Sequence, residues 1–225
     1  MKQLVIQGGK KLFGTINISG SKNASLPILA ATLLVDEKII LKNIPDVKDI
    51  STMINLLESI GKKINFLDSR NEIVITSKKN KKLIAPYNLV KTMRAGVLVL
   101  GPLLAKYGQA RVSLPGGCAI GSRPVDLHID MLRKMGAKIK IDKGYIVAKV
   151  IKKLKPSKLK FETISVGATE NLIMAATLCK GKTIIKNIAI EPEIIDLINF
   201  LNKSGAKIFF NSKRTITIEG VESLK

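Results

Sequence analysis

An internal repeat that divides the chain into three similar units is the feature that most constrains the fold. Three stretches share the pattern of an amphipathic helix, a glycine and an alternating strand, and they occupy residues 56–64, 131–139 and 200–208. Their glycines, which are 75 and 69 residues apart, are Gly61, Gly136 and Gly205. Glycine just past a helix is typical of a left-handed cap. The repeat therefore predicts three copies of one helix–strand unit.

Each unit also contains an earlier and more apolar helix. Residues 30–33 and 175–178 share the sequence Ala-Ala-Thr-Leu, and a looser middle copy runs over residues 94–104. A helix that is apolar around much of its circumference is buried, and strands are expected after two of these helices, at residues 39–43 and 183–187. The fold class expected is therefore α/β, with three repeated units whose buried central helices are surrounded by short sheets and outer helices.

The starts of the central helices are candidates for binding an anion. Superposing the repeats aligns three pairs of residues, Lys22-Asn23, Met93-Arg94 and Gly167-Ala168. Each pair falls at the N-terminus of a central helix, where free N–H groups and a positive partial charge suit phosphate groups. Two of the three pairs also carry a cation. Pseudo-symmetry is expected to bring these ends together as one surface for an anionic ligand.

A glycine-rich loop carries a single cysteine. Residues 115–121 read Pro-Gly-Gly-Cys-Ala-Ile-Gly with Cys118 at the centre, and a helix is expected to start directly afterwards, within residues 122–127. Arg123 at that helix start adds a positive field, which favours anions and lowers the pKa of a thiol. The loop is therefore interpreted as an anion site with an ionisable thiol in it. A passive loop cysteine is the alternative.

Other titratable residues have a structural interpretation beside a functional one. His128, the single histidine, is equally consistent with a helix-surface residue and with a ligand contact. Cys179 ends an apolar helix and is expected to be a buried structural thiol. The carboxylates of Asp49, Glu191 and Glu193 are interpreted as charges in the first turns of helices.

Composition disfavours several classes of protein. The formal net charge is +21, but the basic residues are mostly scattered lysines, and there are no Trp, three Tyr and six Phe to stack on bases, which argues against nucleic-acid binding. The longest apolar run, residues 95–105, is far shorter than the roughly 20 residues of a membrane span. Residues 1–7 alternate like a strand and lack a signal-peptide segment. Two cysteines in different contexts suggest neither a disulfide framework nor a metal cluster. A cytoplasmic protein without metal or cofactor is expected.

Four motifs together resemble one enzyme family over the whole chain. They are Ser-Gly-Ser-Lys-Asn-Ala at residues 19–24, Tyr-Asn-Leu-Val-Lys-Thr-Met-Arg-Ala at 87–95, the stretch 115–127, and Ser-Val-Gly-Ala-Thr at 165–169. In this combination the chain closely resembles the UDP-N-acetylglucosamine enolpyruvyltransferases, whose domains are inside-out α/β barrels. The resemblance implies transfer of the enolpyruvyl group of phosphoenolpyruvate to the 3′-hydroxyl of UDP-N-acetylglucosamine, with release of phosphate. This reaction begins the synthesis of peptidoglycan precursors, and no cofactor or metal is implied.

The resemblance also assigns roles to individual residues. Cys118 corresponds to the general acid that protonates the enol carbon, and Lys22 and Arg123 correspond to residues that hold the phosphate of phosphoenolpyruvate. Asn23 corresponds to a substrate contact, and Arg94 to a contact with the nucleotide sugar. The uridine and diphosphate region would be lined by Arg123, Pro124, Val125, Asp126, Leu127, Ser165 and Val166. Thr163 stands where relatives often have a lysine that contacts the diphosphate, so that contact is the one in question.

The family pattern implies a second domain. Its members are about twice as long and have two similar domains with the site between them, so residues 1–20 are expected to start the second, mostly missing domain, and residues 21–225 to form the three-repeat domain. The chain is then expected to be a fragment, or to work with a separate chain that carries the C-terminal half, and to be inactive alone. The alternatives are the shikimate-pathway enolpyruvyl transferase, a non-catalytic remnant that binds nucleotide sugar, and a lysine-rich nucleic-acid binder.

Overall fold

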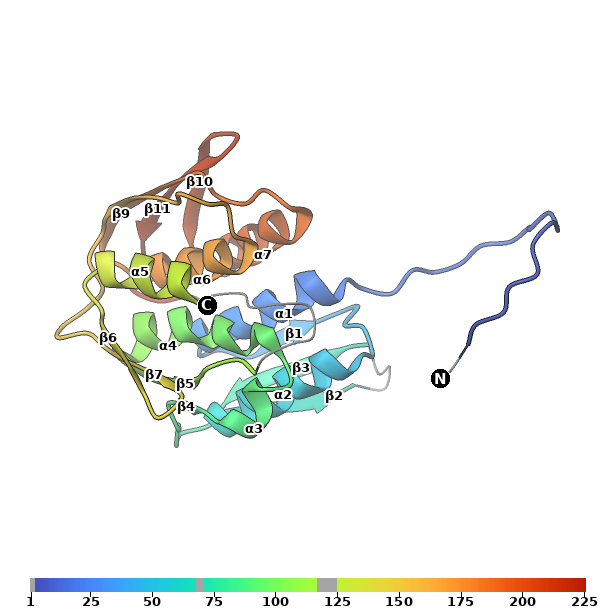
Figure 1. The fold of residues 1–225 in the computed structure, drawn as a ribbon, viewed down its shortest axis with the longest axis horizontal. Coiled ribbons are helices and arrows are strands. Elements are labelled where there is room, and N and C mark those ends of the chain that lie inside the picture. Colours follow the sequence, from blue (N-terminus) through green and yellow to red (C-terminus); the bar gives the residue numbers. More distant parts are fainter. Residues whose placement is uncertain (1–2, 68–70, 117–124) are drawn as a thin grey trace.

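The three repeated units are present in the fold. The computed structural model describes residues 3–67, 71–116 and 125–225, and Figure 1 shows its helices between small sheets. Along the chain each unit has a central helix, a strand, an outer helix and a hairpin of two more strands. The expected α/β fold class is confirmed.

The helices and strands have the following bounds. The first unit consists of α1 (Lys22–Ala31), the 3-10 helix η1 (Thr32–Leu34), β1 (Ile39–Leu41), α2 (Lys48–Ile60), β2 (Lys62–Phe66) and β3 (Ile73–Ser77). The second consists of β4 (Ile84–Ala85), α3 (Tyr87–Val90), the 3-10 helix η2 (Arg94–Val99), α4 (Leu100–Tyr107), β5 (Gln109–Ser113), α5 (Asp126–Lys134), β6 (Lys138–Asp142) and β7 (Tyr145–Lys149). The third consists of β8 (Lys158–Lys160), α6 (Val166–Thr177), β9 (Gly181–Lys186), α7 (Pro192–Lys203), β10 (Lys207–Ser212) and β11 (Thr215–Gly220).

The three sheets share a three-stranded arrangement, to which the second and third sheets each add one edge strand, β4 and β8. Their strand orders are β1-β3-β2, β4-β5-β7-β6 and β10-β11-β9-β8. In every unit the strand after the central helix pairs antiparallel with the second strand of the hairpin, as β1 does with β3, β5 with β7 and β9 with β11. Alternation along the hairpin strands puts apolar residues on the inner face, for example the paired Ile64 and Ile75. The shared pairing supports the repeat found in the sequence.

The capping glycines adopt the conformation that the sequence predicts. Gly61, Gly136 and Gly205 have φ angles of 129°, 94° and 98°, which lie in a region that side chains with a Cβ rarely enter. Gly61 directly follows α2, Gly136 and Gly205 lie two residues beyond the ends of α5 and α7, and each glycine turns the chain into the first strand of the hairpin. The repeated helix–glycine–strand pattern is therefore a structural signature of the outer layer.

The central helices form the core. In α6 every residue from Ala168 to Thr177 is buried, and in α1 the apolar residues from Leu29 to Ala31 are fully buried. Helix α6 packs against α1, η2 and α4, while the outer helices α2, α5 and α7 pack on the central ones (Figure 1). These contacts explain why the sequence of the central helices has no polar face: each is surrounded by protein.

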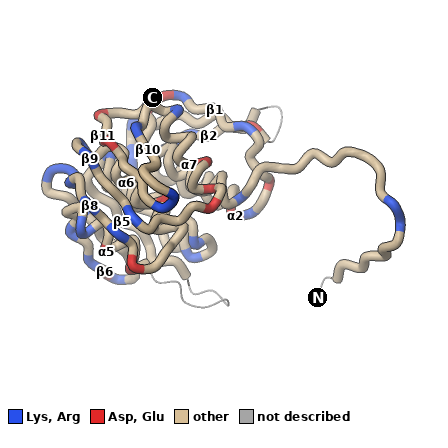
Figure 2. Tube along the Cα trace, turned by 90° about the horizontal axis from the view of Figure 1, so that it is seen from above, with Lys and Arg blue, Asp and Glu red and all other residues tan. Residues whose placement is uncertain are grey.

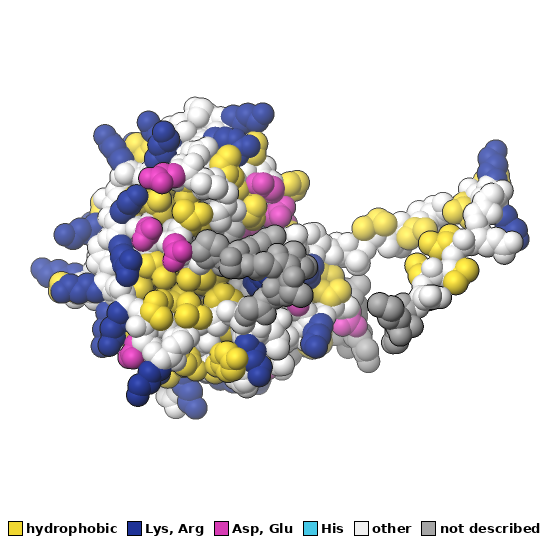
Figure 3. All heavy atoms as spheres, in the orientation of Figure 1, with side chains coloured by type: hydrophobic (Ala, Val, Ile, Leu, Met, Phe, Trp, Pro, Cys, Tyr) yellow, Lys and Arg dark blue, Asp and Glu magenta, His cyan; other side chains and the backbone are white. Residues whose placement is uncertain are grey.

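The N-terminal segment differs from the rest of the fold. Residues 3–20 contain no helix or strand and extend away from the body of the molecule (Figure 1). Residues 3–7, whose sequence alternates like a strand, form no strand in this structure, because an extended segment without a neighbouring strand has nothing to pair with. Figure 3 shows hydrophobic side chains along this segment, and those that are at least 80% exposed are Leu4, Val5, Ile6, Leu12, Phe13, Ile16 and Ile18. The domain boundary after residue 20 stays a prediction.

The positive charges are spread over the body. Figure 2 shows lysines and arginines on many elements rather than on one face. This agrees with the scattered lysines of the sequence. In the part of the chain that the structure describes, no helix is both long and apolar enough to cross a membrane.

Candidate functional site

The start of α1 carries the first pair of predicted residues. Ser21 caps the helix, because its side chain accepts a hydrogen bond of 3.3 Å from the backbone N–H of Ala24. Lys22 and Asn23 follow in the first turn and are exposed. The Nζ atom of Lys22 lies 3.0 Å from Oδ2 of Asp49, in the first turn of α2. The predicted phosphate-binding lysine is thus held at the helix start by a carboxylate of the neighbouring outer helix.

The start of α6 has the same construction. Ser165 is extended, with a φ of −139°, and its side chain accepts a hydrogen bond of 3.3 Å from the N–H of Ala168. Val166 is the first helical residue, and both residues are half-buried. Thr163 lies before the helix and is exposed. Both helices begin with a serine cap, but the caps are one residue out of step with the sequence alignment: superposing Ser21 on Ser165 places Lys22 on Val166 rather than on Gly167.

The middle unit departs from this construction. Arg94 begins a 3-10 helix, η2, and the α-helix proper starts only at Leu100. The residue before it, Met93, is extended and provides no side-chain cap. Arg94 is half-buried at this start. The predicted position of the arginine at the beginning of a central helical segment is confirmed, but the type of helix is not the one expected.

The helix after the glycine-rich loop begins within the range expected from the sequence, residues 122–127. Helix α5 starts at Asp126, with Val125 before it, and its first turn is exposed at Asp126 and half-buried at Leu127. Three predicted residues, Cys118, Arg123 and Pro124, lie outside the described residues. Their roles stay predictions. Helix α5 packs against α6, so Asp126 and Leu127 stand on the helix beside the one that Ser165 and Val166 begin.

His128 is the point where the sequence left two interpretations open. It is buried, with 8% of its surface exposed, so the surface interpretation is wrong. Its Nδ1 atom lies 3.0 Å from Nδ2 of Asn171 on α6. Burial lowers the pKa of His128 to about 4, so the ring is neutral at physiological pH. Asn171 was not singled out in the sequence, although a polar residue inside an apolar helix is a signal for it.

Burial also shifts the pKa of two other side chains. Cys179 is buried as expected, its thiol lies 2.9 Å from the carbonyl oxygen of Leu154, and burial raises its pKa to about 11. Glu170 on α6 was not singled out in the sequence, and burial, together with Glu193 and Glu191, raises its pKa to about 8. Glu193 lies in the first turn of α7, as expected.

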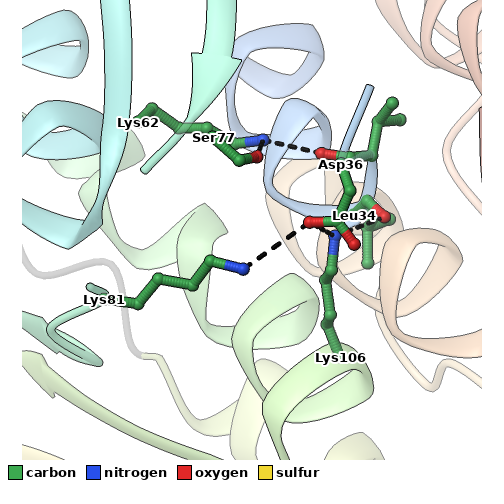
Figure 4. Close-up of polar contacts among 7 residues, drawn as sticks. Leu34, Asp36, Lys62, Ser77, Lys81 and Lys106 are labelled. Carbon is green, nitrogen blue, oxygen red and sulfur yellow. Dashed lines mark hydrogen bonds and ion pairs between the residues drawn. The ribbon is translucent and has the colours of Figure 1, made fainter. Parts of the chain in front are cut away.

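A separate cluster of charges lies at the opposite end of α1. Lys62, Lys81 and Lys106 surround the end of η1 and the carboxylate of Asp36 (Figure 4). Lys106 lies 2.8 Å from Oδ1 of Asp36 and 3.0 Å from the carbonyl oxygen of Leu34. Lys62 lies 2.7 Å from the carbonyl oxygen of Val35. These contacts satisfy carbonyl groups at the helix end, so the cluster has a structural explanation.

Two hollows on the surface lie near the first unit. A hollow of about 180 Å³ lies at the start of α1, and its lining includes Ser21, Ala24 and Asp196 of α7. A larger hollow of about 310 Å³ lies beside α2, contains none of the predicted site residues and is mostly apolar. The smaller hollow adjoins the capped start of α1, but it is likewise lined by none of the predicted site residues. Among the described residues no group of three or more His, Cys, Asp or Glu side chains is arranged to hold a metal ion.

Comparison with known proteins gives consistent relatives. The family model described as EPSP synthase (3-phosphoshikimate 1-carboxyvinyltransferase) matches residues 6–225. A protein of Pelagibacter ubique named UDP-N-acetylglucosamine 1-carboxyvinyltransferase is 60% identical over 225 residues, which are 100% of this chain and 54% of that protein. A protein of the same name from Coxiella burnetii is 55% identical over 224 residues and is covered to 51%.

Solved structures show the same fold at low identity. The enolpyruvyl transferase NikO from Streptomyces tendae superposes with a TM-score of 0.82 at 19% identity, over 96% of this chain and 51% of that one. EPSP synthase from Acinetobacter baumannii superposes with a TM-score of 0.75 at 17% identity, over 94% and 48%. The chain spans about half the length of the curated relatives that it matches.

Proposed function

Because this chain belongs to the EPSP synthase (3-phosphoshikimate 1-carboxyvinyltransferase) family, we propose that it forms about half of an enolpyruvyl transferase. The reaction transfers the enolpyruvyl group of phosphoenolpyruvate to the 3′-hydroxyl of UDP-N-acetylglucosamine and releases inorganic phosphate. The observation that carries the choice of acceptor is the 60% identity, over the whole chain, to a relative named for that activity. EPSP synthase from Acinetobacter baumannii, by contrast, is 17% identical.

The chemistry is an addition followed by an elimination. Cys118 donates a proton to the enol carbon of phosphoenolpyruvate, which makes the neighbouring carbon electrophilic. The oxygen of the sugar hydroxyl adds to that carbon and loses its proton to a base in the second half of the enzyme. The tetrahedral intermediate then loses a proton from the methyl carbon, and the bond to phosphate breaks. Lys22 and Arg123 balance the charge of the phosphate group throughout.

The nucleotide sugar is bound along helix starts. Free N–H groups at the starts of α5 and α6 suit the diphosphate, and the serine cap of α6 holds its first turn in place. Arg94, at the start of η2, contacts the sugar nucleotide from the middle unit. Lys22 and Asn23 contribute the start of α1, and the remaining binding residues are Pro124, Val125, Asp126, Leu127, Thr163, Ser165 and Val166.

Turnover needs a second half that the longer relatives carry. The exposed apolar residues of the segment 3–19 fit an edge of that second domain, because strands with unpaired N–H and C=O groups add to a sheet edge. We place residues 1–20 in that domain, and the second half is either continuous with this chain or a separate C-terminal-half chain. We also place the enzyme in the cytoplasm, at the first committed step of peptidoglycan precursor synthesis.

The test is phosphate release from phosphoenolpyruvate. This chain is assayed alone and mixed with the remaining half of the Pelagibacter ubique relative, with UDP-N-acetylglucosamine or shikimate 3-phosphate as acceptor. Release only in the mixture and only with the nucleotide sugar supports the proposal. Release with shikimate 3-phosphate would assign the chain to the shikimate pathway instead. Nucleotide-sugar binding to this chain without release in the mixture would identify a binding remnant.

Cys118→Ser is the matched variant for the chemical step. A serine hydroxyl is a far weaker acid than a thiol, so phosphate release in the mixture is expected to fall by about 100-fold or more. Binding of the nucleotide sugar is expected to stay within about twofold, because the other proposed contacts are unchanged. Loss of folding in this variant would mean that the thiol is structural.

A further inference from the structure

The side-chain amide of Asn171 is fixed by two backbone groups. Its Oδ1 atom accepts a hydrogen bond of 2.5 Å from the N–H of Gly101, and its Nδ2 atom donates one of 2.9 Å to the carbonyl oxygen of Val97. A backbone N–H donates and a carbonyl oxygen accepts, so the amide has one orientation at this place. Asn171 is 1% exposed, so its amide is removed from bulk water.

The orientation of Asn171 determines the tautomer of His128. Nδ2 of Asn171 is a donor, so Nδ1 of His128, 3.0 Å away, accepts and carries no proton. The proton of the neutral ring is therefore on Nε2. Burial, which lowers the pKa of His128 to about 4, keeps the ring in this neutral form. A protonated ring would present a second donor to Nδ2 of Asn171.

The other edge of the ring lies against the first turn of α6. A Cβ atom placed on Gly167 would lie 3.5 Å from Cε1 and 3.6 Å from Nε2 of His128. Gly167 is the second residue of α6, directly after Val166. The imidazole ring of α5 therefore contacts α6 through Asn171 in its second turn, and its other edge faces the first turn of α6 across a space that a methyl group would fill.

These contacts connect two of the helix starts proposed to bind the nucleotide sugar. Val97 belongs to η2, which begins at Arg94, and Gly101 is the second residue of α4. Asn171 belongs to α6, which begins just after Ser165. We propose that Asn171 and His128 are positioning residues, which fix the start of η2 relative to the starts of α5 and α6 so that one nucleotide sugar contacts all three. The identity of the ligand rests on the proposed function, whereas the fixed arrangement of the three helix starts does not.

Asparagine is suited to this role for a chemical reason. The position needs one acceptor for Gly101 and two N–H donors, one for Val97 and one for His128, and a short amide side chain offers all three. Aspartate would lack the donor, and leucine would leave the three groups without partners. Unpaired buried polar groups are costly, so the surrounding segments would move to find other partners. Movement of a binding residue by about 1 Å is enough to weaken binding or slow catalysis strongly.

The first test needs no ligand and no variant. Nitrogen-15 chemical shifts of the His128 ring, measured on the whole chain between pH 6 and 8, report which ring nitrogen carries the proton. The expected result is an unprotonated Nδ1 and a protonated Nε2 across this range. The opposite tautomer, or a ring that titrates near pH 6.5, would overturn the proposed arrangement.

The second test compares three variants by amide chemical shifts. In His128→Leu the acceptor is lost, and amide shifts are expected to change both in residues 94–97 of η2 and at Ser165 and Val166. In His128→Asn a carbonyl oxygen at the place of Nδ1 restores the acceptor, and most of these shifts are expected to return. Asn202→Leu is the matched control, because the Asn202 amide also makes two backbone hydrogen bonds, both to Ile208, but on α7. Unchanged shifts in η2 with His128→Leu would overturn the proposal.

The third test measures binding of UDP-N-acetylglucosamine by calorimetry. Binding by the wild-type chain checks the proposed function. If the wild-type chain does not bind the nucleotide sugar, that result counts against the proposed function, and the chemical-shift measurements still test the positioning role. Where the wild type binds, His128→Leu and Asn171→Leu are expected to weaken binding by about tenfold or more. His128→Asn and Asn202→Leu are expected to stay near the wild type. Equal weakening by Asn202→Leu would mean that loss of stability, rather than positioning, explains the effect.

Discussion

The Nζ atom of Lys62 lies 2.7 Å from the carbonyl oxygen of Val35, the residue that follows η1. Lys62 directly follows the capping glycine of its unit, where the other two units have the small residues Ala137 and Ala206. All three positions are buried. The first unit therefore places an amine where the others place a methyl group, and this amine meets the negative end of the central helix.

Lys62 is expected to make stability depend on pH in the alkaline range. Burial and the nearby Lys106 lower the pKa of Lys62 to about 8, against the 10.5 of a free lysine, while Asp36 partly opposes them. Between pH 8 and 10.5 the unfolded chain binds more protons than the folded one, so the free energy of unfolding contributed by Lys62 rises with pH. Urea unfolding at several pH values should show a smaller rise in Lys62→Met than in the wild type. If the unfolding free energy rises equally with pH in the wild type and in Lys62→Met, that result would contradict the lowered pKa of Lys62.

Lys106 is expected to matter through the carbonyl group that it satisfies. Lys106→Met removes the donor to the carbonyl oxygen of Leu34 and the 2.8 Å contact with Asp36. Leaving a buried acceptor without a partner should lower the free energy of unfolding by about 1–3 kcal/mol. The matched control is Lys140→Met, which removes an exposed pair with Asp142 and should cost no more than about 0.5 kcal/mol. Equal costs would mean that the Leu34 contact contributes nothing.

Asp49 is expected to compete with a phosphate group for Lys22. The two side chains form an ion pair of 3.0 Å and are partly exposed, so the pair contributes only about 0.2–1 kcal/mol. Asp49→Asn removes the competing charge and should tighten binding of phosphoenolpyruvate by about two- to fivefold. Titration by calorimetry at low salt measures this, with Asp142→Asn as a control of equal charge change. Weaker binding in Asp49→Asn would mean that Asp49 orients Lys22 instead of competing.

His128 is expected to lower stability in acid. Its folded pKa of about 4 lies below the 6.5 of a free histidine, so its contribution to stability is present above pH 6.5 and is lost as pH falls towards 4. The loss is on the order of 3 kcal/mol. Burial raises the pKa of Glu170 to about 8, so the contribution of Glu170 to stability falls as the pH rises from 4.5 to 8. This opposes the change due to His128 and masks part of the dependence of the unfolding free energy on pH. The difference in unfolding free energy between wild type and His128→Asn isolates the histidine, and a difference independent of pH would contradict the assignment.

The local parts of the fold could be predicted from the sequence, and the contacts between units could not. The capping glycines and the apolar central helices depend on neighbouring residues, so their pattern is visible in the chain. Asn171 contacts Gly101, Val97 and His128, which are 70, 74 and 43 residues away, and no periodicity encodes such partners. The burial of Lys62 could not be predicted either, because the sequence alone suggests a surface lysine. The 3-10 start of the middle central helix was missed as well, and one of its carbonyl groups, that of Val97, accepts a hydrogen bond from Asn171 of the third unit.

Gly101 is expected to be irreplaceable, because it lies against Asn171. A Cβ atom on Gly101 would overlap both the backbone carbonyl oxygen and the side-chain oxygen of Asn171. Gly101→Ala should therefore force α4 and α6 apart and cost about 3 kcal/mol or more in the free energy of unfolding. Gly167→Ala is the matched control, because its Cβ would make an ordinary contact of 3.5 Å with His128. Alanine suits a helix better than glycine, so this variant should be neutral or more stable by up to about 1 kcal/mol. Chemical unfolding of both variants measures the difference, and equal stabilities would show that α4 and α6 have room to separate at this contact.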